Sequence, residues 1–506
     1  MNASPPVTPR RAWFGLVVLM LPVFLISVDN TVLTFALPQI AEEFRPSAST
    51  QLWMVDIYSL VLAALLVAMG SFGDRIGRRR ILLIGSVGFG VVSVAAAFSP
   101  SAEALVAARA LLGVFGAMLM PSTLSLLRNM FLNDNDRRLA IAIWGSGFAV
   151  GSSVGPILGG VLLEHFRWGS VFLIAVPLLL PLLIFARWLL PESKDPNPGP
   201  VDPLSILLTF TMMLPIVWAV KTAAHEGLDV LTVLAFVVGI ASGWLFVRRQ
   251  NRSKTPMLDM GLFRYAPFTS SVISNFLSIA GLIGFMFFVT QHLQLVLGLS
   301  PLHAGLVMLP GAVCSVFAGL FVVKLAQRFA PHQLMMVGLV LISAGFFMII
   351  LFRHDLNVVA IITSFVVLEL GVGMSQTISS DTIVSAVPPA KAGAASAVSE
   401  TAYELGAVVG TATLGTIFTA NYRANIVLPD GLSAAQAKDA GESIAGATSV
   451  AEELPGGIAQ QLLDSAFLAF DSGILPTALI AGLGTLIAAI IVARANRGHS
   501  TGRVVR

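Results

Sequence analysis

Runs of about twenty apolar residues recur along the whole chain, and a run of that length crosses a lipid bilayer as a helix. Only 11% of the 506 residues are charged, whereas about 25% are charged in a typical soluble domain. A helix satisfies its backbone polar groups internally, as a membrane span must. The sequence therefore predicts an all-α integral membrane protein and excludes a soluble globular one.

We predict fourteen spans from these runs, and most of the connections between them are short. The expected limits are residues 13–37, 51–71, 81–98, 103–126, 138–162, 169–190, 204–221, 229–247, 270–297, 303–325, 333–351, 357–380, 394–420 and 474–493. A proline-rich segment, 191–203, follows the sixth span, and a basic segment, 248–269, follows the eighth. The two breaks set spans seven and eight apart, which predicts a 6+2+6 arrangement.

The same breaks divide the chain into five expected parts. These are a tail at 1–11, a six-helix half at 12–190, an inserted helix pair with its loops at 191–269, a second six-helix half at 270–493 and a tail at 494–506. The second half contains the long loop 421–473, which is acidic, rich in Ala, Gly and Ser, and expected to hold short surface helices. The first apolar run is too long for a cleaved signal peptide, so we expect it to remain as span one.

Basic residues predict the orientation of the spans, because Lys and Arg concentrate in cytoplasmic loops. With both termini in the cytoplasm, 23 of the 30 Lys and Arg residues fall in the cytoplasmic segments. We therefore expect a multi-pass membrane protein with cytoplasmic N- and C-termini.

Three charged residues of the first half lie within predicted spans. Asp29 lies in span one, Asp56 in span two and Arg109 in span four, all at similar expected depth. Charged residues at membrane depth are costly and usually functional, and a buried arginine needs a carboxylate or carbonyl partner. Asp29 and Asp56 are therefore candidate proton-coupling or cation-binding groups and Arg109 a charge partner; a purely structural ion pair is the alternative.

The second half carries its own carboxylates. Glu369 is expected near mid-membrane, and Glu400 and Glu404 lie four residues apart on one face of span thirteen. Two such close carboxylates cannot both ionise cheaply in a low dielectric, so one of them is expected to carry a proton. We favour Glu404, because Glu400 lies nearer the inner end and is expected to be solvated. Asp381, at the inner end of span twelve, is expected to be solvated or to cap a helix.

Two glycine-rich segments indicate close helix contacts. Segment 70–80 reads GSFGDRIGRRR and contains Gly70, Gly73, Asp74, Arg75, Gly77 and Arg78. In span five, Gly147, Gly151 and Gly155 recur at every fourth residue and are followed by Pro156, Gly159 and Gly160. Small residues at this spacing let two helices approach closely, and proline plants a kink.

Segment 70–80 resembles the signature loop of the major facilitator superfamily, and the string from Gly151 to Gly160 resembles the antiporter motif of its drug-export members. SVDNTVLTFALP (27–38) is similar to an element of the 14-helix drug–proton antiporters of the QacA type, and the resemblance covers essentially all fourteen spans. It implies a major facilitator fold, a loop that latches the two halves, and a role in proton or substrate coupling for Asp29. Ser27, Val28 and Thr34 depart from the element. Span ten lacks the acidic residue that such pumps often have, so their substrate range is not carried over whole.

Methionine and aromatic side chains form adaptable apolar surfaces, and aromatic rings attract cations. Possible cavity-lining residues are Phe35, Tyr58, Trp144, Phe148, Phe285, Met286, Phe288 and Met374; each is individually more often a packing residue.

We therefore expect a proton-driven efflux antiporter for amphipathic cationic drugs such as ethidium, acriflavine, quaternary ammonium compounds and fluoroquinolones. The alternatives are a narrow exporter of one metabolite or of a tetracycline-like drug, an uptake symporter, and a membrane enzyme or sensor. The sequence shows no Walker motif, nucleophile constellation or metal-ligand cluster, and it has one cysteine. We expect no catalytic residue, no metal and no cofactor beyond the coupling proton. The small net charge of +3 does not suggest nucleic-acid binding, and the expected partners are the drugs and the bilayer, with the protein a monomer.

Overall fold

The computed structural model describes residues 9–44, 46, 48–196, 202–226, 229–253, 256–353 and 355–495. The side chains of Phe35, Asp56 and Pro156 are outside this description, so the predictions for these three residues lie outside the described residues. Every regular element in the described ranges is a helix. The α-helices are α1 (Pro9–Phe44), α2 (Ala48–Ile76), α3 (Arg78–Ala97), α4 (Ala102–Met130), α5 (Asp134–His165), α6 (Ser170–Leu173), α7 (Ala175–Leu189), α8 (Pro203–Glu226), α9 (Val230–Arg252), α10 (Ala266–Gln291), α11 (Pro301–Leu325), α12 (Pro331–Phe352), α13 (Val358–Ser385), α14 (Ala392–Asn425), α15 (Ala434–Glu442), α16 (Ile444–Glu452), α17 (Gly456–Ser472) and α18 (Ile474–Ala495), with short η elements at Met260–Arg264, His292–Val296 and Pro389–Lys391.

In the described part of the chain, twelve helical segments are long and apolar enough to cross a membrane. The predicted all-α integral membrane protein is thereby confirmed. Helices α5 and α14 are 32 and 34 residues long but are not among the twelve. Both are rich in glycine, alanine and polar residues, which lowers their mean hydropathy.

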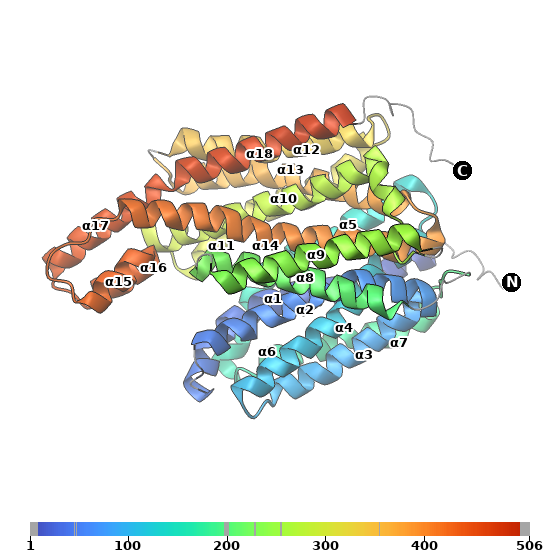
Figure 1. The fold of residues 1–506 in the computed structure, drawn as a ribbon, viewed down its shortest axis with the longest axis horizontal. Coiled ribbons are helices and arrows are strands. Elements are labelled where there is room, and N and C mark those ends of the chain that lie inside the picture. Colours follow the sequence, from blue (N-terminus) through green and yellow to red (C-terminus); the bar gives the residue numbers. More distant parts are fainter. Residues whose placement is uncertain are drawn as a thin grey trace.

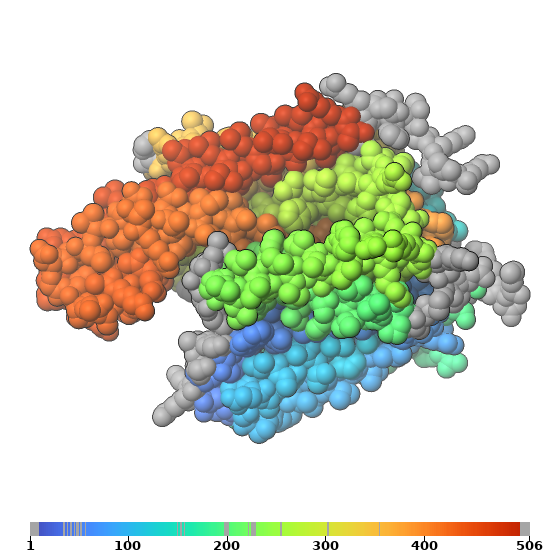
Figure 2. All heavy atoms as spheres, viewed as in Figure 1, coloured from blue at the N-terminus to red at the C-terminus, as the bar shows by residue number. Residues whose placement is uncertain are grey.

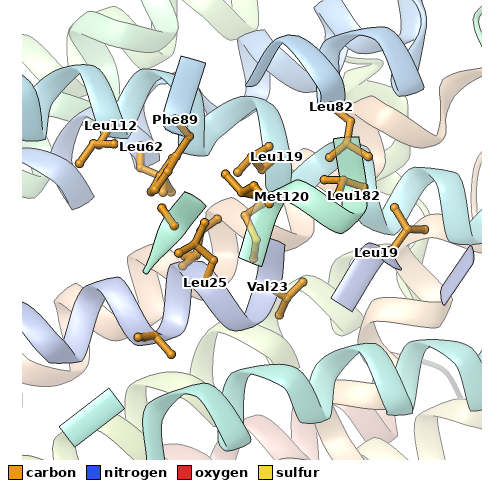
Figure 3. Packing of buried hydrophobic residues seen from close by; sticks show 14 of the residues in the cluster. Leu19, Val23, Leu25, Leu62, Leu82, Phe89, Leu112, Leu119, Met120 and Leu182 are labelled. Carbon is orange, nitrogen blue, oxygen red and sulfur yellow. The ribbon is translucent and has the colours of Figure 1, made fainter. Parts of the chain in front are cut away.

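Two large apolar cores hold the bundle together. One is built almost wholly from residues between Ala12 and Leu190, and the other from residues between Ile279 and Val492. In the first core, Phe89 of α3 lies beside Leu62 of α2 (Figure 3). We call the residues around these cores the N half and the C half.

Helices α8 and α9 form a hairpin that lies across the middle of the view in Figure 1. Val217 of α8 shares an apolar cluster with Leu60 of α2 and Val408 of α14, and α8 packs against both of these helices, so the hairpin touches both halves. Asp202, just before α8, accepts two hydrogen bonds of 2.8 Å from Arg249 near the end of α9. These bonds, with those from Ser205, lower the pKa of Asp202 to about 2.

Helices α15–α17 project from one end of the bundle (Figures 1 and 2). Tyr422 of α14 donates a 2.9 Å hydrogen bond to the Ala440 carbonyl, and Ala447 and Leu462 join the core of the C half. The short surface helices predicted for the loop 421–473 are therefore present. Helix α1 begins and α18 ends at the opposite end of the bundle (Figure 1), which we call the terminal end.

Candidate functional site

A buried ion pair joins α1 to α4 inside the N half. Arg109 Nη1 donates to Asp29 Oδ2 at 2.5 Å, and Arg109 Nε donates to the Met54 carbonyl at 3.2 Å. The Asp29 residue is 6% exposed and Arg109 is 1% exposed. Breaking such a pair from one side leaves an uncompensated buried charge, which costs about 3–5 kcal/mol. The carboxylate and the carbonyl are the two kinds of partner that a buried arginine requires.

Tyr58 of α2 lies beside this pair. The Arg109 guanidinium lies over the Tyr58 ring, 4.6 Å from its centroid, which is a cation–π geometry. The Tyr58 residue is fully buried, and its hydroxyl has no hydrogen-bond partner among the described residues. The charges of Asp29, Arg109 and Glu404 all act on this hydroxyl, so the N-half pair and a carboxylate of α14 share one electrostatic environment.

The C half places two carboxyl groups out of water. Glu369 on α13 is 6% exposed and is hydrogen-bonded by Ser315 of α11. Glu400 on α14 is 5% exposed, so the expectation that it is solvated is wrong. Packing between helices, and not distance from the helix end, decides its burial. Glu404, one turn further along α14, is the more exposed of the two and also interacts with other groups.

At the terminal end, Asp74 joins the N half to the C half. Its carboxylate accepts hydrogen bonds from the backbone N–H groups of Gly393 and Ala394, at 2.9 and 3.0 Å. These groups belong to the first turn of α14, which has no side-chain cap of its own. A carboxylate at a helix N-terminus satisfies free donors and complements the helix dipole. Arg78 also pairs with Asp74, through Nε at 2.8 Å and Nη2 at 2.5 Å.

The rest of segment 70–80 reinforces this contact. Arg78 reaches the Ala390 carbonyl of the C half at 2.8 Å and is 1% exposed. A Cβ added to Gly70 would lie 2.5 Å from the Gly393 carbonyl oxygen and 2.6 Å from the Ala397 Cβ. Only a glycine at position 70 therefore lets α2 and α14 approach this closely.

The other residues of this segment have different surroundings. Gly77 has φ +115°, a conformation that favours glycine, and a side chain there would meet Glu192 at 2.6 Å. Gly73 lies against Ile81 of α3. Arg75 is partly buried and has an interaction partner.

A second contact between the halves involves Asp381, at the end of α13. Its carboxylate accepts a 2.7 Å hydrogen bond from Arg137 Nε and a 2.9 Å bond from Arg138 Nε, both from the start of α5. Asp381 is 3% exposed, so the prediction of a solvated or capping residue is wrong. Two arginines of the other half cover the carboxylate, and contacts so distant in the sequence leave no local signal.

The glycines of α5 line its contact with α1. A Cβ on Gly147 would lie 3.3 Å from Val23, and one on Gly151 would lie 2.7 Å from Ser27 Cβ and 2.9 Å from the Phe24 carbonyl oxygen. A Cβ on Gly155 would overlap Thr31. The two helices therefore meet at four-residue steps, on both sides of the turn that holds Asp29. Gly159 is buried, whereas a Cβ on the exposed Gly160 would meet nothing.

This contact gives a matched pair of variants. Gly151→Ala pushes against backbone as well as a side chain, so we expect it to destabilise the protein by about 1–3 kcal/mol, the usual cost of overpacking. Gly160→Ala meets no neighbour and should leave stability unchanged or slightly higher, since alanine favours a helix over glycine. Thermal unfolding of the two purified variants in detergent measures the difference. Equal melting temperatures would contradict the α1–α5 packing.

The structure separates the proposed cavity-lining aromatic residues into two groups. Phe148 of α5 stacks on Tyr403 of α14, with ring centroids 5.2 Å apart and planes at 27°. Trp144 is buried and donates from Nε1 to Thr123 at 3.1 Å. Phe285 and Phe288 are packed in the core of the C half, Met374 is also part of that core, and Met286 packs against it. Tyr403 was not among the predicted residues. The sequence around it, an aromatic residue between two glutamates of one helix, does not show which residue of another helix it contacts.

Comparison with known proteins assigns the family. A sequence model of the Major Facilitator Superfamily matches residues 19–411, more than half of the chain. The chain belongs to this superfamily. The superfamily consists of transporters, so the protein is a transporter and not an enzyme.

Two curated members of the superfamily and one solved structure are similar to this chain. The "Multidrug efflux pump LfrA" of Mycolicibacterium smegmatis is 71% identical over 490 residues, which cover 97% of each chain. The "Methyl viologen resistance protein SmvA" of Salmonella typhimurium is 35% identical over 462 residues, covering 91% of this chain and 93% of the relative. The crystal structure of the human organic anion transporter MFSD10 (TETRAN) has a TM-score of 0.59 at 14% identity, and the match covers 95% of this chain and 100% of that one. This likeness shows the fold alone.

Proposed function

We propose that this protein is a proton-driven multidrug efflux antiporter. The observation that carries the proposal is the 71% identity to a multidrug efflux pump over 97% of the chain. Buried carboxyl groups support a coupling role for protons, since intramembrane ionisable groups typically form proton or substrate pathways. Asp29, Glu369 and Glu400 are such groups among the described residues, and Glu404 lies on the same helix as Glu400.

A chain that crosses the membrane fourteen times is consistent with this function. We propose that α5 and α14 cross the membrane along with the twelve more apolar segments, since each packs along helices of that set and is long enough to span. The arrangement is then 6+2+6 with α8 and α9 as the inserted pair, and its parts follow the division predicted above. The distribution of Lys and Arg supports cytoplasmic termini, which makes the terminal end the cytoplasmic side of a bacterial plasma membrane.

Transport proceeds by alternating access between the two halves. The contacts of Asp74 and Asp381 hold the halves together at the terminal end, and they must open to admit a drug from the cytoplasm. A cationic drug is held by ionised carboxylates, and protons arriving from outside neutralise them and release it. Only a difference in affinity between the two states drives such a cycle. The coupling ion is the proton, with no other cofactor, and the functional unit is the monomer.

The substrates are amphipathic cations: dyes such as ethidium and acriflavine, quaternary ammonium compounds and fluoroquinolones. Methyl viologen, in the name of one relative, is itself an organic dication. Expression in an efflux-deficient host should lower the accumulation of several unrelated cations, and a protonophore should restore it. Lowered accumulation of a single compound would favour a narrow exporter, and raised accumulation would favour uptake.

A further inference from the structure

The stacked rings of Phe148 and Tyr403 connect the two halves at one point. Phe148 packs against the core of the N half, and Tyr403 packs against the core of the C half. Among the ring pairs of the described residues, this one alone joins the two cores. A contact between rings on separately moving bodies cannot persist when those bodies separate.

The N half fixes the position of Phe148. Ser27 of α1 donates a 2.8 Å hydrogen bond to the Phe148 carbonyl. Trp144 meets the Phe148 ring edge-on, with centroids 5.6 Å apart, and is itself anchored to Thr123 of α4. Phe148 therefore presents one face of a held ring toward the C half.

Acidic residues of the C half lie close to Tyr403 along the chain. Glu400 precedes it by three residues on α14 and Glu404 follows directly. The charges of Glu404, Glu400 and Glu369 all act on the Tyr403 side chain. The site thus combines an aromatic face with negative charge, which is the environment that a flat aromatic cation requires.

We propose that Phe148 and Tyr403 form an aromatic clamp that selects planar cations among the substrates. An aromatic ring between two others needs a centroid separation of about 7–8 Å, twice the normal contact distance. The rings are 5.2 Å apart now, so the clamp is closed. Separation of the halves by a few ångströms opens it to a planar ring, and stacking of the two residues on each other after release replaces the contact with the drug.

The inference rests on the proposed efflux function and concerns the specificity of the same site. Carboxylates alone are enough to bind a cation without rings, whereas a planar aromatic cation also binds between the two rings of the clamp. Replacement of either ring is therefore expected to affect the two substrate classes unequally.

The test compares ethidium with cetyltrimethylammonium, a cation without an aromatic ring, in an efflux-deficient host. Phe148→Leu and Tyr403→Leu should each lower resistance to ethidium about fivefold to tenfold, in line with the loss of one stacking and one cation–π contact. Resistance to cetyltrimethylammonium should change less than about twofold by the same reasoning. Tyr403→Phe keeps the ring and should retain ethidium resistance.

A matched control removes a stack that lies within one half. Phe285 and Phe365 stack with centroids 5.6 Å apart, both inside the core of the C half. Phe285→Leu should lower the amount of folded protein in the membrane, and resistance to both compounds should fall with it in equal proportion. Resistance is normalised to that amount for every variant.

If Phe148→Leu and Tyr403→Leu lower resistance to both compounds equally, or lower resistance to neither, the proposed clamp is wrong. The proposed efflux function would still stand. If the unchanged protein confers resistance to neither compound, the proposed function itself fails.

Discussion

Replacement of Asp29 by asparagine is expected to abolish pH-driven efflux of ethidium from vesicles. The carboxylate is buried against Arg109 at 2.5 Å, and a proton on Asp29 would remove the charge that holds this arginine. Asparagine cannot take up or release that proton, so the link between protonation and the α1–α4 contact is lost. Retained pH-driven efflux in this variant would exclude a proton-coupling role for Asp29.

Loss of stability needs a separate control, because asparagine also leaves Arg109 buried without its counter-charge. This should cost about 3–5 kcal/mol. The double variant Asp29→Asn/Arg109→Gln removes both charges and should recover most of the stability, since a neutral pair of similar volume often replaces a buried ion pair without loss. Its efflux should remain absent. Recovery of coupling in the double variant would reduce the pair to a structural role.

Replacement of Asp381 by asparagine is expected to loosen the terminal end and strongly reduce transport. Two buried or half-buried arginines of α5 share this one carboxylate, and both lose their ion pair across the halves. The equilibrium should shift toward separation of the halves at this end. Spin labels at Asn135→Cys and Pro388→Cys, with Cys314 replaced by serine, should report longer distances than in the parent protein.

Asp134 provides a matched comparison for Asp381. It pairs with the same Arg137 at 3.0 Å, but its side chain is 70% exposed and it lies in the same half. Asp134→Asn should therefore leave both the distances and the transport close to those of the parent, since exposed pairs contribute about 0–1 kcal/mol. Identical distance distributions in the Asp381→Asn variant and the parent would contradict a clasp at this position.

The helical architecture was predictable because each membrane span carries its own signal, a long apolar run. The environment of Asp29 was partly predictable for a similar reason: a buried charge needs a partner, and Arg109 lay at a matching depth. A close helix contact along α5 also followed from glycines at four-residue spacing, although the helix that they face, α1, did not.

Contacts between the halves were not predictable in this way. Asp381 and Glu400 sit near helix ends, where solvation is the ordinary expectation, and helices distant in the sequence bury them instead. Phe148 was a candidate among many aromatic residues, and only the fold pairs it with Tyr403. Local patterns report burial along one helix, whereas these residues depend on how two six-helix halves meet.

Coupled movement of protons and drug is the central claim, and purified protein in proteoliposomes tests it most directly. A pH-sensitive dye is trapped inside, an acidic interior is imposed, and ethidium is added outside. Coupled exchange predicts that ethidium accumulates inside while the interior becomes less acidic, and that neither change occurs with Asp29→Asn. Ethidium accumulation without proton movement, or proton movement that is independent of ethidium, would contradict it.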